Sequence, residues 1–104
     1  MNAILIDPLK KEISDVSYTD ERDMESLINC NWCYCVEELT NGDALYADEE
    51  ANTEADCETL NSTVEFFYKG IGRICGVALL LRKYPEGNVL TSLDDVRKNV
   101  RWLD

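Results

Sequence analysis

The sequence predicts one α+β domain, a mainly antiparallel sheet of about five to six strands with two helices on one face. Three observations predict this class. One long apolar run lacks helical character, several short alternating segments are separated by turn residues, and two segments have a helical apolar stripe. A length of 104 residues with 45% hydrophobic residues suits a single domain over residues 1–104.

The most apolar stretch of the chain is residues 71–81, which only Arg73 interrupts with charge. Gly72 and Gly76 would each cost about 1 kcal/mol inside a helix relative to alanine, so a strand is favoured. The run is shorter than the roughly 20 residues that span a bilayer. Near-continuous apolarity is typical of a strand buried on both faces, so we expect this run to be the central strand.

A hairpin and a helix are expected in the first 30 residues. Residues 3–6 and 11–18 form the two predicted strands, joined by a turn at residues 8–10. Asp20 can cap a helix over residues 20–29. Its apolar stripe, with i, i+3, i+4 spacing, consists of Met24, Leu27 and Ile28.

The next segment predicts a second hairpin. Residues 32–39 alternate between polar and apolar, and Asn41-Gly42 is a strong hairpin signal, so residues 44–47 should return as a strand. Residues 48–60 have neither the helical nor the strand period of apolar residues, and we expect a mobile loop there.

The last third predicts a strand, the central run, a turn and a helix. Residues 63–68 have strand composition, and residues 84–88 are rich in turn formers. Ser92 opens a segment resembling a capping box, which predicts a helix to about residue 103. The expected apolar side of this helix consists of Leu93, Val96, Val100 and Leu103.

The charge distribution is the sharpest feature of the sequence. The net charge of −11 disfavours direct binding to nucleic acid or to an anionic membrane, and favours a basic partner. Residues 23–68 contain twelve acidic residues and no Lys or Arg. The carboxylates that we expect to form a partner-binding acidic face are Glu37, Glu38, Asp43, Asp48, Glu49 and Glu50. The same pattern also fits a solvated face that serves solubility alone.

Three cysteines lie close together in the sequence. Cys30 and Cys33 have the spacing of half a zinc site, and Cys35 adds a third thiol. A zinc site at these residues is an alternative that needs a fourth ligand from Cys57 or Cys75, because there is no histidine. The odd total of five cysteines and the absence of a secretory signal lead us to expect a cytoplasmic protein with reduced thiols.

Enzymatic signatures are missing from the sequence. Without histidine the most common general base is absent, and no glycine-rich phosphate loop follows a predicted strand. We therefore expect a non-enzymatic protein with no catalytic residues and no cofactor.

The overall pattern resembles a family of small phage and mobile-element proteins known as domain of unknown function 3846. The resemblance is carried by residues 3–8, the helix at 23–28, the Asn41-Gly42 turn region, the strand at 70–80 and the helix start at 91–96. The cysteine segment at residues 30–35 and the loop at residues 52–60 depart from the family pattern. The resemblance implies an accessory role in a bacterial host cytoplasm and transfers no site residues.

These observations lead to one main functional hypothesis. The protein is expected to be a non-enzymatic accessory protein that binds a host protein through its acidic face, as an inhibitor or a DNA mimic. The alternatives are the small cysteine-based metal-binding module and a homodimer that binds a small ligand. The sequence leaves open whether the protein is a monomer or a homodimer.

Overall fold

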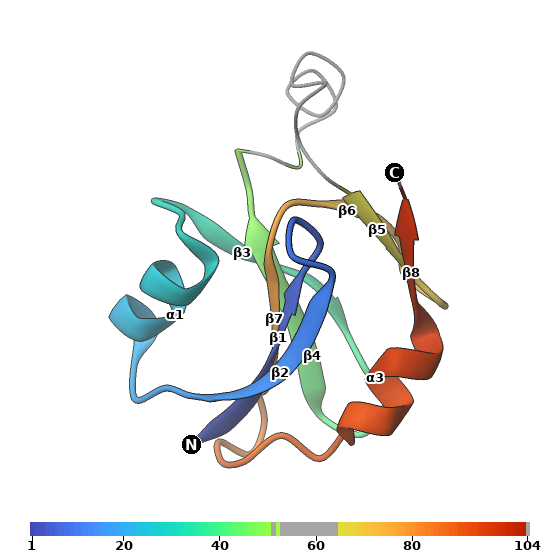
Figure 1. Ribbon diagram of the computed structural model, residues 1–104. Coiled ribbons are helices and arrows are strands. Elements are labelled where there is room, and N and C mark those ends of the chain that lie inside the picture. Colours follow the sequence, from blue (N-terminus) through green and yellow to red (C-terminus); the bar gives the residue numbers. More distant parts are fainter. Residues whose placement is uncertain (51, 53–64, 104) are drawn as a thin grey trace.

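The computed structural model describes residues 1–50, 52 and 65–103, and the elements of this part form three layers (Figure 1). The middle layer is a five-stranded sheet, flanked by a helix on one side and by a three-stranded sheet with a second helix on the other. In spatial order the five strands are β2 (Glu12–Ser17), β1 (Asn2–Asp7), β7 (Ala78–Arg82), β4 (Asp43–Asp48) and β3 (Cys33–Glu38). The smaller sheet consists of β6 (Gly72–Cys75), β5 (Glu65–Tyr68) and β8 (Val100–Leu103), and the helices are α1 (Glu21–Ile28) and α3 (Leu93–Asn99).

The predicted α+β class is confirmed, and every strand pairing is antiparallel. The arrangement differs from the expectation in two ways. The described residues hold eight strands in two sheets, rather than about five to six in one, and the helices lie on opposite faces of the larger sheet. Successive side chains of a strand point to opposite faces, and the side chains on both faces of β7 are apolar and buried. Each face of the larger sheet therefore needs a covering layer.

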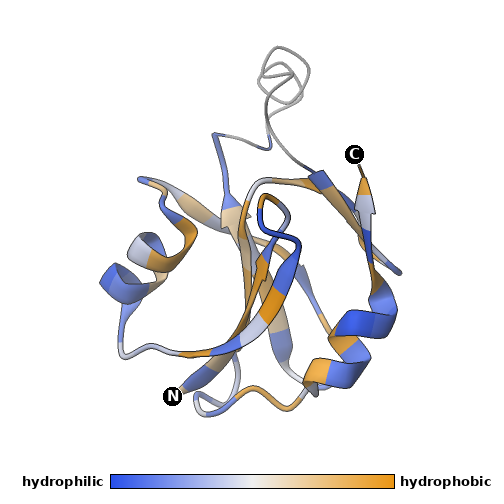
Figure 2. Ribbon diagram, viewed as in Figure 1, coloured by the Kyte–Doolittle hydropathy of each residue, from blue (hydrophilic) through white to orange (hydrophobic). Residues whose placement is uncertain are grey.

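Two hydrophobic cores cover the two faces of the five-stranded sheet. The main core lies toward the three-stranded sheet and α3, and its large buried side chains are Ile4, Ile6, Leu45, Phe66, Ile74, Leu80 and Val96. The second core lies toward α1 and consists of Ala3, Tyr18, Ile28, Leu79 and Leu81. β1 and β7, in the middle of the sheet, are coloured largely as hydrophobic in Figure 2.

The long apolar run forms two strands rather than one. Its first half is β6 in the three-stranded sheet, and its second half is β7, which is the central strand of the five-stranded sheet. The break falls at Gly76, whose φ of 81° is in the left-handed region that residues with a Cβ rarely adopt. The glycine therefore lets the chain pass from one sheet to the other, and the prediction of one central strand holds only for residues 78–82.

Both predicted hairpins and the first helix are confirmed. β1 pairs with β2, and β3 pairs with β4 through the Asn41-Gly42 turn. Gly42 has a φ of 95°, and a Cβ at this position would overlap the Tyr84 carbonyl oxygen. Asp20 caps α1 by accepting a hydrogen bond from the Asp23 amide.

The second helix is shorter than predicted. Ser92 caps α3 as expected, but the helix ends at Asn99, and residues 100–103 form β8, paired with β5. The expectation of a helix to about residue 103 is therefore wrong. Val100 and Trp102 both pack against the main core, and their spacing of two residues is the period of a strand. The pairing of this segment with β5 therefore overrides the helical spacing of its apolar residues.

The expected strand at residues 63–68 is present as β5 within the described residues. The loop expected at residues 48–60 falls largely outside them.

Candidate functional site

The six carboxylates predicted to form one acidic face do not lie together. Asp43 is completely buried at the start of β4, so it cannot belong to a surface. Glu37 and Glu38 lie at one end of β3, and Asp48, Glu49 and Glu50 follow the other end, because Cys33 pairs with Asp48 in the hairpin.

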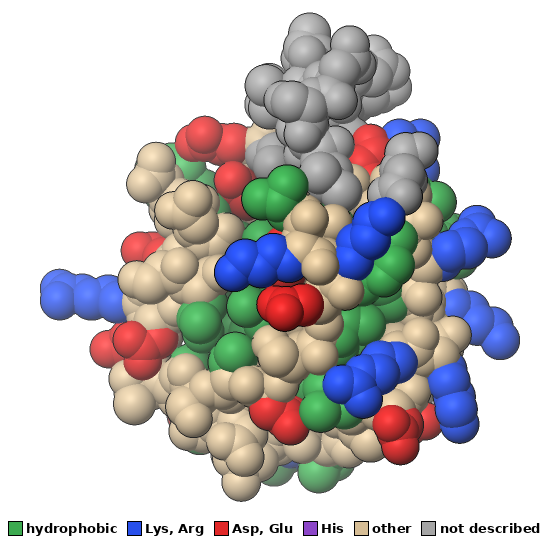
Figure 3. Space-filling model, viewed as in Figure 1, with side chains coloured by type: hydrophobic (Ala, Val, Ile, Leu, Met, Phe, Trp, Pro, Cys, Tyr) green, Lys and Arg blue, Asp and Glu red, His purple; other side chains and the backbone are tan. Residues whose placement is uncertain are grey.

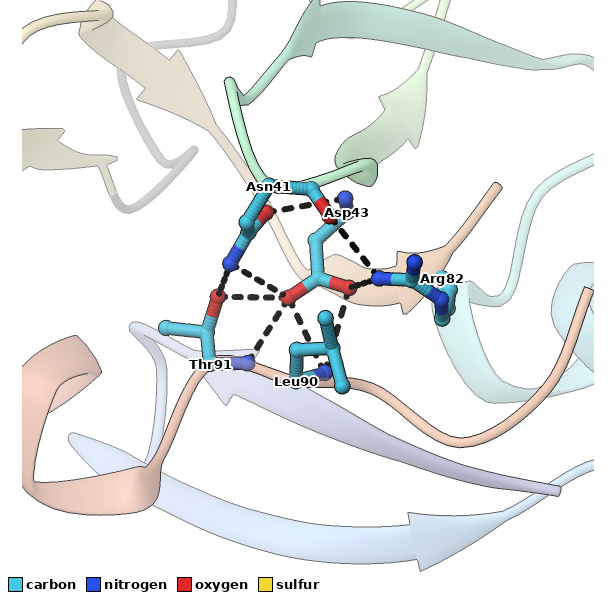
Figure 4. Close-up of polar contacts among 5 residues, drawn as sticks. All are labelled: Asn41, Asp43, Arg82, Leu90 and Thr91. Carbon is cyan, nitrogen blue, oxygen red and sulfur yellow. Dashed lines mark hydrogen bonds and ion pairs between the residues drawn. The ribbon is translucent and has the colours of Figure 1, made fainter. Parts of the chain in front are cut away.

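Asp43 instead holds together three parts of the chain (Figure 4). Its carboxylate accepts hydrogen bonds from the Leu90 amide at 3.1 and 3.2 Å, and from the Thr91 amide at 2.7 Å and hydroxyl at 2.6 Å. The Asn41 side-chain amide donates at 3.2 Å, and the Arg82 guanidinium lies 3.6 Å away. This carboxylate therefore joins the β3–β4 turn, β7 and the segment before α3, and its hydrogen-bonding capacity is used structurally.

Glu37 and Glu38 are exposed, and a β-bulge sets their positions. The pairing of β3 with β4 shifts between Cys35 and Glu37, so that Glu37 pairs with Leu45 and Glu38 with Ala44. Glu38 forms an ion pair with Lys83, which raises the pKa of the lysine ammonium. One of the two carboxylates is thus already partly neutralised.

The other predicted carboxylates lie beyond β4. Asp48 is half-buried and accepts a hydrogen bond from the Glu50 amide at 3.0 Å. Glu49 and Glu50 are exposed, and the Glu49 amide donates to the Trp32 carbonyl at 2.8 Å. The hairpin therefore presents two exposed pairs, one at each end of β3.

A cavity between α1 and the β3–β4 hairpin was not predicted from the sequence. It has a volume of about 280 Å³, and its lining consists of Glu21, Met24, Glu25, Asn31, Trp32, Cys33 and Tyr46. The Trp32 side chain is 64% exposed, although its large apolar ring suits a core position. The apolar spacing of α1 shows which side of the helix packs on the sheet, but not that the turn before β3 leaves a hollow beside it.

Negative charge around this cavity affects Tyr46. Burial is the main cause that raises the pKa of its phenol, and the negative charges of Glu38 and Glu21 raise it further, with the Cys35 thiol adding and Lys83 opposing. Of these two carboxylates, Glu21 of α1 lines the cavity, whereas Glu38 of β3 lies outside its lining.

The cysteines do not form the expected trio of thiols. Cys30 and Cys33 are joined by a disulfide, so the expectation of reduced thiols is wrong for these two residues. Burial raises the pKa of the Cys35 thiol, which favours the protonated form that is a poor metal ligand. Within the part of the chain that the structure describes, no group of three or more His, Cys, Asp or Glu residues is placed to hold a metal ion. Of the two expected sources of a fourth ligand, Cys57 lies outside that part, and Cys75 is buried and disulfide-bonded, so it is not a free thiol either.

Half of the ten Lys and Arg residues belong to the three-stranded sheet, its connecting turn and α3. Figure 3 shows Lys and Arg side chains gathered on the side of β8 and α3. The basic residues of the three-stranded sheet, its connecting turn and α3 are Lys69, Arg73, Arg97, Lys98 and Arg101. Several of them have partners: Arg73 pairs with Glu65, Arg97 lies 3.8 Å from Asp94, and Arg101 lies over the ring of Phe67 at 5.2 Å.

Comparisons with known proteins add no relative. No protein-family model, no curated protein and no solved structure matches this chain. The resemblance to the phage and mobile-element family thus stays a prediction. Neither helix of the described residues is long and apolar enough to span a membrane.

Proposed function

We propose that this protein is a non-enzymatic interaction protein that binds a basic protein surface through its β3–β4 hairpin. The contact is made by the hairpin carboxylates, defined as the exposed Glu37, Glu38, Glu49 and Glu50. Asp43 and Asp48, which the sequence grouped with them, have structural hydrogen bonds instead.

The observation that supports this proposal best is the shortage of cations on the hairpin side. Neither Glu37 nor Glu49 has a basic partner among the described residues, and Lys83 is paired only with Glu38. Five of the other nine Lys and Arg residues belong to the three-stranded sheet, its connecting turn and α3, and among the described residues only Lys69 of these five lines a pocket together with Glu37 and Glu38. The chain as a whole has a net charge of −11. A partner with a positive surface would be attracted to the hairpin side and oriented by this asymmetry.

The spacing of the carboxylates favours a basic protein surface over mimicry of a DNA backbone. β3 separates the two exposed pairs by roughly 17 Å, at about 3.3 Å per residue. Duplex DNA carries a charge about every 1.7 Å along its axis. Two separate pairs of carboxylates match two basic patches of a protein better than they match a continuous phosphate track.

The biological setting of this binding rests on the resemblance alone. It suggests an accessory protein of a phage or mobile element that inhibits a host protein. The resemblance implies a bacterial cytoplasm for this role, whereas the disulfide between Cys30 and Cys33 is typical of an oxidising compartment. The net charge argues against direct nucleic-acid binding as part of that role.

The two alternatives gain less support. The disulfide between Cys30 and Cys33 removes two of the three thiolates that the zinc module requires. A dimer through the edge strand β3 is opposed by its two glutamates and its β-bulge, which are features that hinder edge-to-edge pairing.

The proposal is tested by a pull-down from bacterial lysate with two variants of equal net charge. The test variant replaces Glu37, Glu38, Glu49 and Glu50 by glutamine. The control variant replaces the same number of exposed carboxylates that do not belong to the hairpin, namely Glu12, Asp15, Glu86 and Asp94, by their amides. The immobilised protein and its bound partners are washed at low and at high salt, because salt screens contacts between exposed charges.

We expect the wild type and the control to retain the same basic protein at low salt and to release it at high salt. The test variant should lose at least about tenfold in affinity for that protein, measured by calorimetry. Equal retention by both variants would contradict the proposal, since net charge alone would then explain the binding.

A further inference from the structure

We infer that the cavity between α1 and the β3–β4 hairpin receives a lysine or arginine side chain of the partner. This inference rests on the proposed function and specifies how the partner is held. The hairpin carboxylates attract a basic surface, whereas the cavity selects one cationic side chain from it.

The walls of the cavity suit a cation with an apolar stem. Trp32 and Tyr46 provide aromatic rings, and Met24 provides a flexible apolar surface. A cation over the face of an aromatic ring is attracted by the ring quadrupole, most strongly for tryptophan. Methionine adapts its shape to the methylene groups that a lysine or arginine would bury.

Two carboxylates complete the site. Glu21 and Glu25 are four residues apart on α1, so they lie on one face of the helix, and both line the cavity. Neither has a basic partner among the described residues. Like charges at this spacing destabilise a helix slightly, and a bound cation would relieve their repulsion.

Besides the lining of the cavity, the exposure of Trp32 also indicates a binding site. An indole that is 64% exposed leaves a large apolar surface in contact with water. Tryptophan is enriched among the residues that dominate binding energy at protein interfaces. The disulfide between Cys30 and Cys33 closes the short loop that carries Trp32, which limits the backbone freedom of this loop before a ligand arrives.

A neighbouring cavity shows why the cation belongs on the Trp32 side. That cavity shares Glu21, Met24 and Tyr46, but Arg82 and Lys83 also line it. Their charges would repel a lysine or arginine side chain. The Trp32 cavity has no cation in its lining, so its charge complements a positive side chain.

The test uses peptides that differ only in one side chain. The probes are acetyl-Gly-Lys-Gly-amide, the same peptide with arginine, and the same peptide with Nε-acetyl-lysine, which has no charge. Binding is followed by NMR through the indole N–H resonance of Trp32, with that of Trp102, which packs against the main core, as an internal reference. The lysine and arginine peptides should shift the Trp32 resonance to saturation, while the acetylated peptide and the Trp102 resonance should show no response.

Variants then separate the aromatic wall from the charge. Trp32→Ala should weaken the binding of the lysine peptide about tenfold, followed through a backbone amide of the hairpin. The double variant Glu21→Gln, Glu25→Gln should weaken it by a similar factor. Tyr84→Ala is the matched control, because Tyr84 is another exposed aromatic and is 81% exposed, and this variant should bind as the wild type does.

The outcomes distinguish this inference from the proposed function. Equal binding of the charged and acetylated peptides, or full binding by Trp32→Ala, would overturn the inference. The lysate experiment leaves Glu21, Glu25 and Trp32 unchanged, so its result judges the hairpin carboxylates alone. A partner retained through the hairpin but indifferent to Trp32→Ala would therefore support the proposed function and contradict the cavity.

Discussion

The two faces of the five-stranded sheet differ in how completely they are covered. On the face toward the three-stranded sheet, large side chains such as Phe66 and Leu80 are fully buried, and the one buried carboxylate of the described residues, Asp43, has a full set of donors. On the face toward α1, the short helix covers less of the sheet and leaves a cavity and an exposed Trp32. The first face holds the fold together, and the second has apolar surface and charge left for a partner.

This comparison predicts the largest loss of stability on the main-core face. Phe66→Ala should lower the free energy of unfolding by about 4 kcal/mol, because a fully buried ring that packs edge-on against Trp102 is replaced by a void. Met24→Ala on the α1 face should cost only about 1 kcal/mol, since that side chain is half-exposed. Urea denaturation measures both values. Equal losses would mean that α1 is packed as tightly as the main core.

The next largest effect concerns Asp43. Asp43→Ala should lower the free energy of unfolding by about 3 kcal/mol, because it leaves the amides of Leu90 and Thr91 without their acceptor and the half-buried Arg82 guanidinium without its ion-pair partner. Glu37→Gln is the matched control, and its effect should stay within about 0.5 kcal/mol, since Glu37 is exposed. The two midpoints in urea give the comparison. A small loss for Asp43→Ala would show that the hydrogen bonds accepted by Asp43 are dispensable for stability. Asp43 would then return to the candidates for binding.

Local signals in the sequence were sufficient for the elements whose stabilising contacts are also local. The Asn41-Gly42 turn and the caps at Asp20 and Ser92 depend on residues within four positions, and all three are present. β8 was missed because residues 100–103 satisfy a helical and a strand period equally, and only the pairing with β5 decides between them.

The site depended on contacts that a single sequence does not reveal. The backbone donors to Asp43 come from residues 47 and 48 positions away, so its burial could not be predicted from its neighbours in the sequence. The cavity unites α1, the turn that carries Trp32 and Tyr46 of β4. The sequence did indicate the acidic character of this region, but it placed the charge on a continuous face that the bulge in β3 and the length of the hairpin divide.

The smallest expected effect concerns the start of α1, which supports the cavity. The pKa of the Asp23 carboxyl is lowered, chiefly because the Thr19 hydroxyl and amide donate to it, with the Asp20 backbone contributing less. Since the folded pKa lies below the unfolded one, this contribution to stability is present above the unfolded value of about 4. It is lost as the pH falls through the folded pKa, so the first turn of α1 should loosen in acid.

Thr19→Val removes the hydroxyl donor but retains the backbone amide. The pKa of Asp23 should therefore rise part of the way toward its ordinary value, measured by an NMR titration of the side-chain carboxyl carbon. The amide resonances of α1 should then change at a higher pH than in the wild type. Ser92→Ala, which removes the corresponding cap of α3, is the control and should leave the Asp23 titration unchanged. An unaltered Asp23 titration in Thr19→Val would mean that the hydroxyl does not hold this carboxylate. In that case the first turn of α1, and with it Glu21 at the cavity, would owe its position to the Asp20 cap and to packing on the sheet.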